Sequence, residues 1–239
     1  MPGRKRISVV VVGSLLLAYR IAVAYGNAVK LVVGDYLTGD YIKTLDRTRS
    51  PLAAEAGRSI NLVVVQREDG YTRIQSVIRF HEGGPSFRIG RSGQGVLLDA
   101  AGQDVGAYVV RALNGAELEV GFKGLPVTRF IAVRDLQGFI LRKSVGGTYV
   151  DDKGQSYVFG PGGLATTPKG RFKFTVGVDH VPYRFDYLEV SGTHMILRFV
   201  RKQCALDIYE VTDAETNQAG NDGTHARPWA FLHETGCTD

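Results

Sequence analysis

Residues 73–81 have the sequence RIQSVIRFH, in which the side chains alternate between two faces. One face carries Ile74, Ser76, Ile78 and Phe80, and the other carries mainly charged and polar residues. A period of two is typical of a strand with one buried face. Residues 171–178, with the sequence RFKFTVGV, repeat the pattern and place Phe172, Phe174 and Val176 on one face. These two stretches therefore predict β-strands with apolar inner faces.

Further strand-like segments recur about every ten residues and are separated by turn residues. Asn114-Gly115 and Asp152-Lys153-Gly154 are typical of tight hairpins, and the chain contains 30 glycines. Only residues 37–47 and the Ala-rich segment 51–56 favour a helix, whereas residues 138–143 are expected to form another strand. Many strands without intervening helices indicate an all-β sandwich or closed barrel, and of the two we expect an antiparallel barrel with a short N-terminal helix.

The N-terminus has the order of a secretory signal peptide. Three basic residues at positions 4–6 precede an apolar run at 7–19, and Ala22-Val23-Ala24 provides a small-x-small cleavage site. The apolar run is shorter than the roughly 20 residues that a membrane-spanning helix needs. We therefore expect residues 1–24 to be removed, leaving a periplasmic or extracellular protein without a transmembrane segment. An uncleaved N-terminal anchor is the alternative.

The basic character of the chain comes largely from this segment. The whole chain has 29 Lys and Arg residues and 24 Asp and Glu residues, and four of the basic residues lie in 1–24, which has no acid. The remainder thus has 25 basic residues against 24 acidic ones. A nearly neutral protein has no strong electrostatic attraction to nucleic acid, so no nucleic-acid partner is expected.

The two cysteines, Cys204 and Cys237, are expected to form a disulfide. An oxidising compartment favours such a bond, which here closes a loop of roughly 33 residues. Free thiols, or a metal site with His225 and His233, are the alternatives. Their spacing matches no familiar zinc pattern, so we expect no metal and no cofactor.

The predicted domains follow from these features. Residues 25–211 are expected to form the barrel, and any division within it is expected near residues 134–138. Residues 212–239 are polar and Gly-rich before they become aromatic, and we expect an irregular C-terminal tail that docks through Trp229 and Phe231.

Residues 146–159, with the sequence GGTYVDDKGQSYVF, contain the Gly-x-Tyr, Asp-x-x-Gly and Tyr-x-Phe elements of secreted lipocalin-like barrels. Residues 206–211 similarly resemble the closing strand of that family. The resemblance covers about residues 138–211 and implies a barrel with an apolar cavity. The Gly-x-Trp of true lipocalins is absent, because Gly34-Asp35-Tyr36 and Gly39-Asp40-Tyr41 stand where it is expected.

Two His–carboxylate pairs are candidates for acid–base chemistry. His81-Glu82 and Asp179-His180 each follow a predicted strand, and such groups at one barrel rim could transfer protons. Adjacent strand residues point to opposite faces, however, so each pair need not meet. The competing interpretation is a pair of ordinary rim contacts.

Three functions remain open at this point. The first is binding of a small apolar or amphipathic ligand by the inward candidates Ile74, Ile78, Phe80, Phe172, Phe174 and Val176, although the same residues could simply fill a core. The second is a hydrolase, isomerase or cyclase that uses His81, Glu82, Asp179 or His180. The third is an envelope or partner-interaction protein that uses an outer sheet face and Trp229.

Overall fold

The computed structural model describes residues 31–56, 60–89, 95–98, 102–121, 127–180, 183–211 and 226–238. The predicted signal peptide, residues 1–24, lies outside these ranges. Among the helices of the described ranges, none combines the length and the apolar character needed to cross a bilayer.

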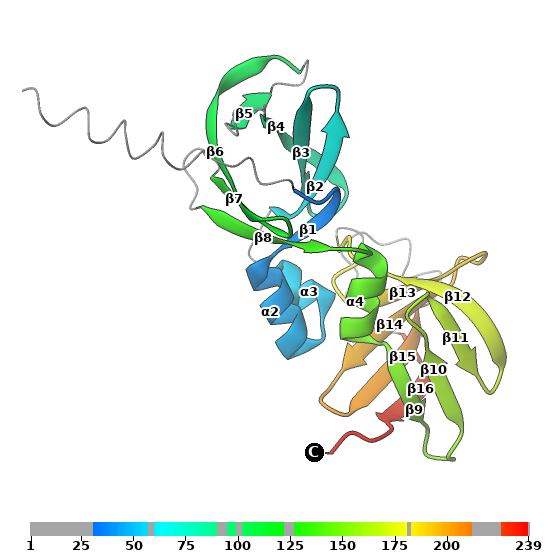
Figure 1. The fold of residues 1–239 in the computed structure, drawn as a ribbon. Coiled ribbons are helices and arrows are strands. Elements are labelled where there is room, and N and C mark those ends of the chain that lie inside the picture. The colour runs from blue at the N-terminus through cyan, green and yellow to red at the C-terminus, as the bar shows by residue number, and fades with distance from the viewer. Residues whose placement is uncertain are drawn as a thin grey trace, which may run out of the picture.

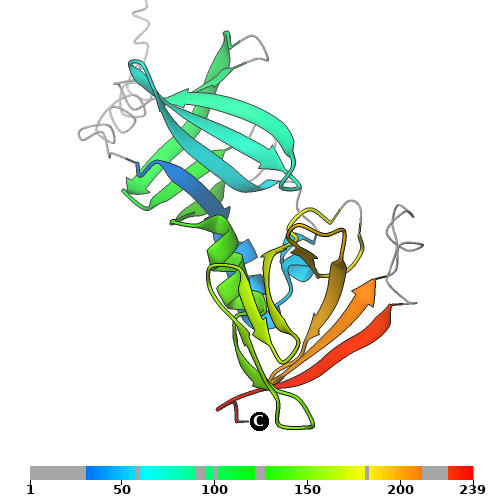
Figure 2. The same cartoon turned by 90° about the vertical axis from the view of Figure 1, so that its right-hand side faces the viewer.

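The described strands form two closed antiparallel barrels, one on each side of a small group of helices (Figure 1). The first barrel is closed by pairing of its first and last strands, and it consists of β1 (Gly34–Thr38), β2 (Ile60–Glu68), β3 (Tyr71–Ile78), β4 (Glu82–Ile89), β5 (Gly95–Leu98), β6 (Asp104–Asn114), β7 (Glu117–Gly121) and β8 (Thr128–Val133). The second is closed in the same way and consists of β9 (Gly147–Val150), β10 (Ser156–Phe159), β11 (Leu164–Thr167), β12 (Gly170–Val176), β13 (Tyr187–Val190), β14 (Ile196–Arg201), β15 (Ala205–Val211) and β16 (Arg227–Glu234). Figure 2 shows the same two barrels turned by 90° about the vertical axis of Figure 1.

The all-β class and the closed antiparallel barrel are confirmed. The sequence predicts one barrel over residues 25–211, whereas the strand pairing gives two, and residues 134–146 connect them. The prediction of an irregular tail over residues 212–239 is wrong for residues 227–234. These residues form β16, which pairs with both β15 and β9. This strand supplies the last edge that the second barrel needs to close.

Residues 73–81, the clearest strand pattern in the sequence, contribute to β3. The strand ends at Ile78, three residues before the alternating pattern ends. Ile74 and Ser76 are buried as expected. Arg79 and Phe80 take φ angles of 47° and 63°, so the chain turns before β4 and residues 79–81 are not strand. Phe80 consequently leaves the first barrel's inner face, and its ring lies 5.3 Å from that of Tyr41.

The predicted N-terminal helix is present as α2 (Gly39–Thr48), and α3 (Pro51–Glu55) follows it directly. The Thr38 side chain caps α2 by accepting a hydrogen bond from the backbone N–H of Tyr41. Ser50 caps α3 through the N–H of Ala53. Both helices are inserted between β1 and β2, so they belong in sequence to the first barrel.

The predicted strand at 138–143 is wrong, because these residues lie in the helix α4 (Leu136–Ser144). Asp135 starts the helix by accepting a hydrogen bond from the N–H of Gly138 at 3.0 Å. A Cβ at position 138 would lie 2.0 Å from an Asp135 carboxylate oxygen, so a larger residue here would displace this carboxylate from its present position. Burial of Ile140 and Leu141 then stabilises a helix in a sequence whose apolar residues also suit a strand.

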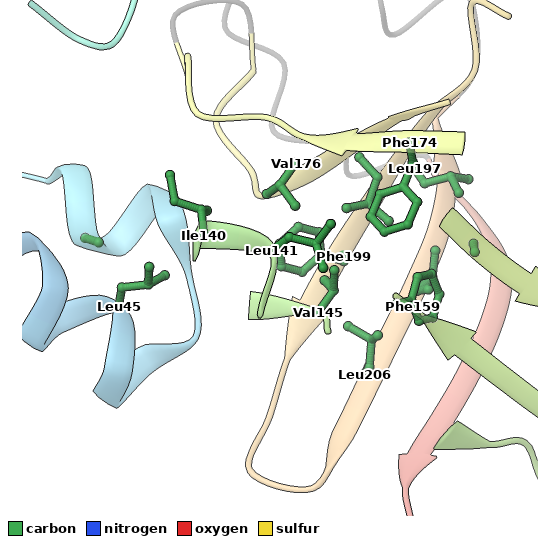
Figure 3. Packing of buried hydrophobic residues seen from close by; sticks show 14 of the residues in the cluster. Leu45, Ile140, Leu141, Val145, Phe159, Phe174, Val176, Leu197, Phe199 and Leu206 are labelled. Carbon is green, nitrogen blue, oxygen red and sulfur yellow. The ribbon is translucent and has the colours of Figure 1, made fainter. Parts of the chain in front are cut away.

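Two large apolar cores and a smaller cluster of Phe185, Tyr187, Ile196 and Val211 hold the described elements together. One fills the first barrel around Tyr36, Phe87 and Phe130. The larger one fills the second barrel and continues through α4 to α2 and α3. Figure 3 shows this continuity, with Leu45 of α2 and Ile140 of α4 on the helical side and Phe174 and Phe199 within the second barrel. Packing of the helices therefore joins the two barrels.

The predicted disulfide is present between Cys204 and Cys237, whose Cα atoms lie 5.6 Å apart. It ties the end of the chain after β16 to the turn between β14 and β15. The bond is compatible with export to an oxidising compartment.

Candidate functional site

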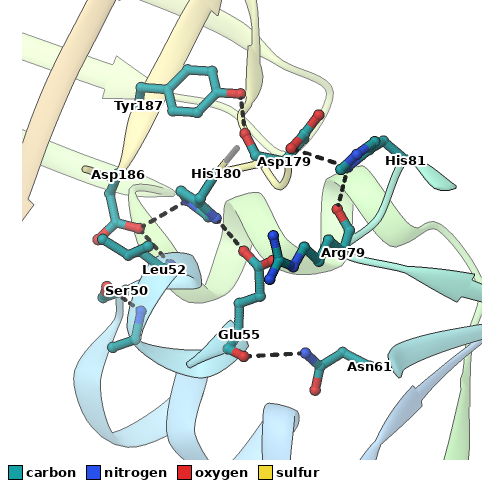
Figure 4. Close-up of polar contacts among 11 residues, drawn as sticks. Ser50, Leu52, Glu55, Asn61, Arg79, His81, Asp179, His180, Asp186 and Tyr187 are labelled. Carbon is teal, nitrogen blue, oxygen red and sulfur yellow. Dashed lines mark hydrogen bonds and ion pairs between the residues drawn. The ribbon is translucent and has the colours of Figure 1, made fainter. Parts of the chain in front are cut away.

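A buried histidine links the second barrel to α3. The His180 side chain, which is 4% exposed, lies in the connection between β12 and β13. Its Nδ1 atom lies 2.7 Å from Glu55 Oε2, and its Nε2 atom lies 3.6 Å from Asp186 Oδ1 (Figure 4). The imidazole thus stands between two nearly buried carboxylates from different parts of the chain.

Further hydrogen bonds hold the Asp186 carboxylate and the backbone of Glu55 in place. Asp186 accepts one from the backbone N–H of Leu52 in α3 at 2.8 Å. The side chain of Asn61 in β2 donates to the backbone carbonyl of Glu55 at 3.4 Å. The cluster of His180, Glu55 and Asp186, called the joint cluster below, therefore connects the first barrel, α3 and the second barrel.

Charge and burial act on His180 in opposite directions. Burial by itself lowers the pKa of His180, because it disfavours the charged imidazolium. The negative charges of Asp186 and Glu55, together with the hydrogen bond to Glu55, outweigh this effect, and the pKa is raised above its ordinary value. The raised pKa favours the imidazolium form of His180, and we infer that this form holds the two carboxylates together.

His81 makes a second, more exposed contact between the barrels. Its Nδ1 atom lies 2.9 Å from the Arg79 carbonyl oxygen and 3.2 Å from Asp179 Oδ1, and its Nε2 atom lies 3.3 Å from Glu82 Oε1. The hydrogen bond to Arg79 and the charges of Asp179 and Glu82 raise the pKa of His81 against the effect of burial. His81 and Glu82 meet because they lie at a turn, where the strand alternation no longer separates them.

The segment that carries Asp179 and His180 is fixed by the side chain of Tyr187. Its hydroxyl donates to the carbonyl of Asp179 at 2.7 Å. Its ring covers Gly177, where an added Cβ would lie 2.1 Å from a ring carbon. Tyr187 thereby sets the path of the chain between β12 and β13.

The four predicted catalytic residues, His81, Glu82, Asp179 and His180, thus gather between the barrels. An efficient general base has a free ring nitrogen and a pKa near the working pH. Each histidine instead has a carboxylate beside each ring nitrogen, its pKa is raised, and His180 is shielded from solvent. This geometry favours a connecting role for the cluster, and catalysis by these residues stays a hypothesis.

The stability contributed by His180 is expected to decrease as the pH rises. Because the folded-state pKa is raised, the contribution is complete below the unfolded value of about 6.5 and is lost as the pH passes through the folded-state pKa. Urea unfolding of the wild type and of His180→Gln should therefore give a stability difference that shrinks between about pH 5.5 and pH 9. A difference that stays constant or grows over this range would contradict the assignment of His180 as a buried cation.

The six predicted ligand-binding residues do not line one cavity. Ile74 is buried in the core of the first barrel, and Ile78 ends a strand of that barrel. Phe80 packs against the core that contains Tyr41. Phe174 and Val176 are buried in the second barrel, and Phe172 is half-buried there. Only the β12 residues therefore share an interior.

The two ends of the second barrel differ in what covers them. Ile140, Leu141 and Val145, of α4 and its C-cap, pack into the core at one end, where the disulfide also lies. The strand register places the turns after β9, β11 and β13 together at the opposite end. None of the described helices covers this second end (Figure 2).

The side chains of Tyr157, Phe172 and Trp229 meet at the end of the second barrel away from α4. We call this group of three side chains the aromatic end. The Trp229 ring lies 6.0 Å from that of Tyr157 and 6.1 Å from that of Phe172, both in edge-to-face geometry. Trp229 sits at an irregularity in the β15–β16 pairing, where Ile208 pairs with Ala230 and Tyr209 with Pro228. Trp229 and Phe172 are half-buried, so the barrel interior ends here in partly exposed rings.

Sequence patterns identified only part of these sites. The partners Glu55 and Asp186 were missed, because Glu55 lies 125 residues from His180 and nothing local pairs the two. Asp186 lies only six residues after His180, but no strand alternation relates them. Trp229 was predicted as a docking residue, and its packing against Tyr157 and Phe172 places it in the barrel wall instead of a tail.

Comparison with known proteins assigns no family. No protein-family model matches the chain, and neither the curated proteins nor the solved structures contain a match. In the described part of the chain, no group of three or more His, Cys, Asp or Glu side chains could hold a metal ion. The closed eight-stranded antiparallel barrel is consistent with the lipocalin-like resemblance, which rests on the barrel and on the hairpin motifs alone.

Proposed function

We propose that this is an exported binding protein whose second barrel takes a small apolar or amphipathic ligand at the aromatic end. The observation that carries the proposal is the meeting of Tyr157, Phe172 and Trp229 at the barrel end that the described helices leave uncovered. Aromatic rings with partly exposed faces bind apolar groups well, because they bury a large area and lose little conformational freedom.

The rest of the interior supports binding at this end and not deep within the barrel. Phe174, Phe159 and Tyr149 continue inward from Phe172, with ring centroids 5.7–6.3 Å apart along the series. These three side chains are at most 3% exposed and contact one another, so they form a packed floor. A ligand would therefore add to the aromatic end and rest on this floor.

The polar surroundings of the aromatic end suit an amphipathic molecule. The Tyr157 hydroxyl donates to Asp151 Oδ2 at 3.4 Å, at the turn between β9 and β10. Asp151 also accepts hydrogen bonds from the backbone N–H groups of Lys153 and Gln155, which fix that turn. An apolar ligand body could thus contact the rings while a polar group stays near the turn and solvent.

Replacing Phe172 with Ser should weaken binding of N-phenyl-1-naphthylamine, a probe whose fluorescence rises in apolar surroundings. We expect about a tenfold increase in the probe's Kd, since one aromatic face of the site is lost. The matched control is Phe231→Ser, because Phe231 lies two residues after Trp229 and is 44% exposed on the outer surface. Equal Kd values for the wild type and both variants would argue against the aromatic end, and thermal unfolding establishes that each variant is folded.

A further inference from the structure

A groove of about 530 Å³ lies on the outer surface of the second barrel, over β12, β13 and the turn that leads to β14. Thr175 and Glu189, which line it, are paired in register and are both exposed. Their sequence neighbours Phe174, Val176, Leu188 and Val190 are buried. Strand alternation therefore places the groove outside the barrel, on the opposite side of the wall from the packed interior.

The groove has a negative charge and oxygen acceptors. Its described lining contains the carboxylate of Glu189, the imidazole of His194 and the hydroxyls of Thr175, Ser191 and Thr193, with no Lys or Arg. Lys173 is paired with Ser191 through a backbone hydrogen bond, but it is not among the lining residues. A protonated amine can donate several hydrogen bonds, and this lining can accept them.

An aromatic ring and apolar side chains complete the lining. Tyr183 stacks on Phe185 with ring centroids 5.3 Å apart and packs in a T-shaped arrangement with Tyr187 at 4.9 Å, so its ring is held in position. Burial and, after it, the charge of Glu189 raise the pKa of Tyr183, so the carboxylate acts on this ring. Met195, which is 36% exposed, adds apolar surface. A cation near an aromatic face gains attraction from the ring as well as from the carboxylate.

We propose that this groove binds a small organic cation in which a protonated amine is attached to an apolar group. Glu189 and the hydroxyls receive the ammonium group, and Tyr183 and Met195 contact the apolar part. The turn after β13 lies at the same barrel end as the aromatic end, but the groove shares no lining residue with the aromatic end or the joint cluster. The proposal therefore does not depend on the function proposed above.

Titration of the isotope-labelled protein with 2-phenylethylammonium, followed by NMR, tests the site. The backbone amide signals of Thr193 and Met195 should shift, and the neutral analogue 2-phenylethanol should bind at least about tenfold more weakly. Glu189→Gln should raise the Kd of the ammonium about tenfold. Glu210→Gln, which removes an exposed carboxylate on β15 outside the groove, should leave it unchanged.

Three results would overturn the proposal. They are equal affinity for the ammonium and the alcohol, tighter binding of the anion 3-phenylpropanoate, and signal shifts that map away from the β13–β14 turn. Unchanged Trp229 fluorescence during the titration separates binding at the groove from binding at the aromatic end, because Trp229 is the single tryptophan of the chain.

Discussion

Replacing His180 with Ala is expected to lower the free energy of unfolding by about 3–5 kcal/mol, the range for breaking a buried ion pair from one side. The side chains of Glu55 and Asp186 are only 12% and 11% exposed. Without the imidazolium, both carboxylates keep their burial but lose the positive charge that offsets it. The large effect thus comes from two unpaired anions as well as from a lost contact.

Urea unfolding at pH 6 measures this loss, with His233→Ala as the matched control. The His233 side chain is 65% exposed and its Nε2 lies 3.8 Å from Asp152, so its removal should change stability by less than about 0.5 kcal/mol. His180→Gln keeps one hydrogen-bonding nitrogen and should lose less than His180→Ala. If both His180 variants unfold like the control, the joint cluster does not stabilise the contact between α3 and the second barrel.

Replacing both Cys204 and Cys237 with Ser is expected to destabilise the protein by about 3–4 kcal/mol. In the chain-entropy model this is the value for a loop of 33 residues, whose unfolded state gains freedom when the bond is absent. The loop contains β16, which closes the second barrel by pairing with β9. Release of this strand would expose Leu232, which is fully buried in the larger core.

Urea unfolding with and without a reducing agent measures the free energy of unfolding that the disulfide contributes. Reduced wild-type protein should match the double variant, and the reducing agent should leave the double variant unchanged. A loss below about 1 kcal/mol, well short of the loop-entropy value, would mean that the strand pairing alone holds the C-terminal end in place.

Features with local causes could be predicted from the sequence. The alternation in residues 73–81 and 171–178 corresponds to β3 and β12, because side-chain direction depends only on the neighbouring residues. The Asp-x-x-Gly turn forms as expected, with Asp151 bound to the following backbone and Gly154 at a φ of 73°. The disulfide followed from the number of cysteines and the expected compartment.

Features that depend on long-range pairing could not be predicted. The division into two barrels is set by pairing of β1 with β8 and of β9 with β16, and no short pattern specifies those partners. The apolar residues of α4 suit a strand or a helix equally, and the helix is stabilised by packing of Ile140 and Leu141 in the larger core, which only the folded chain provides. In the joint cluster, His180 was identified but Glu55 was not, because only the folded chain brings them together.

Quenching of Trp229 fluorescence by a brominated fatty acid tests the central claim, ligand binding at the aromatic end, most directly. Bromine quenches tryptophan only near contact, and Trp229 is the single tryptophan of the chain. We predict saturable quenching by dibromostearate, no quenching by stearate, and weaker quenching in Phe172→Ser than in Phe231→Ser. Unchanged Trp229 emission across the dibromostearate titration would contradict the claim.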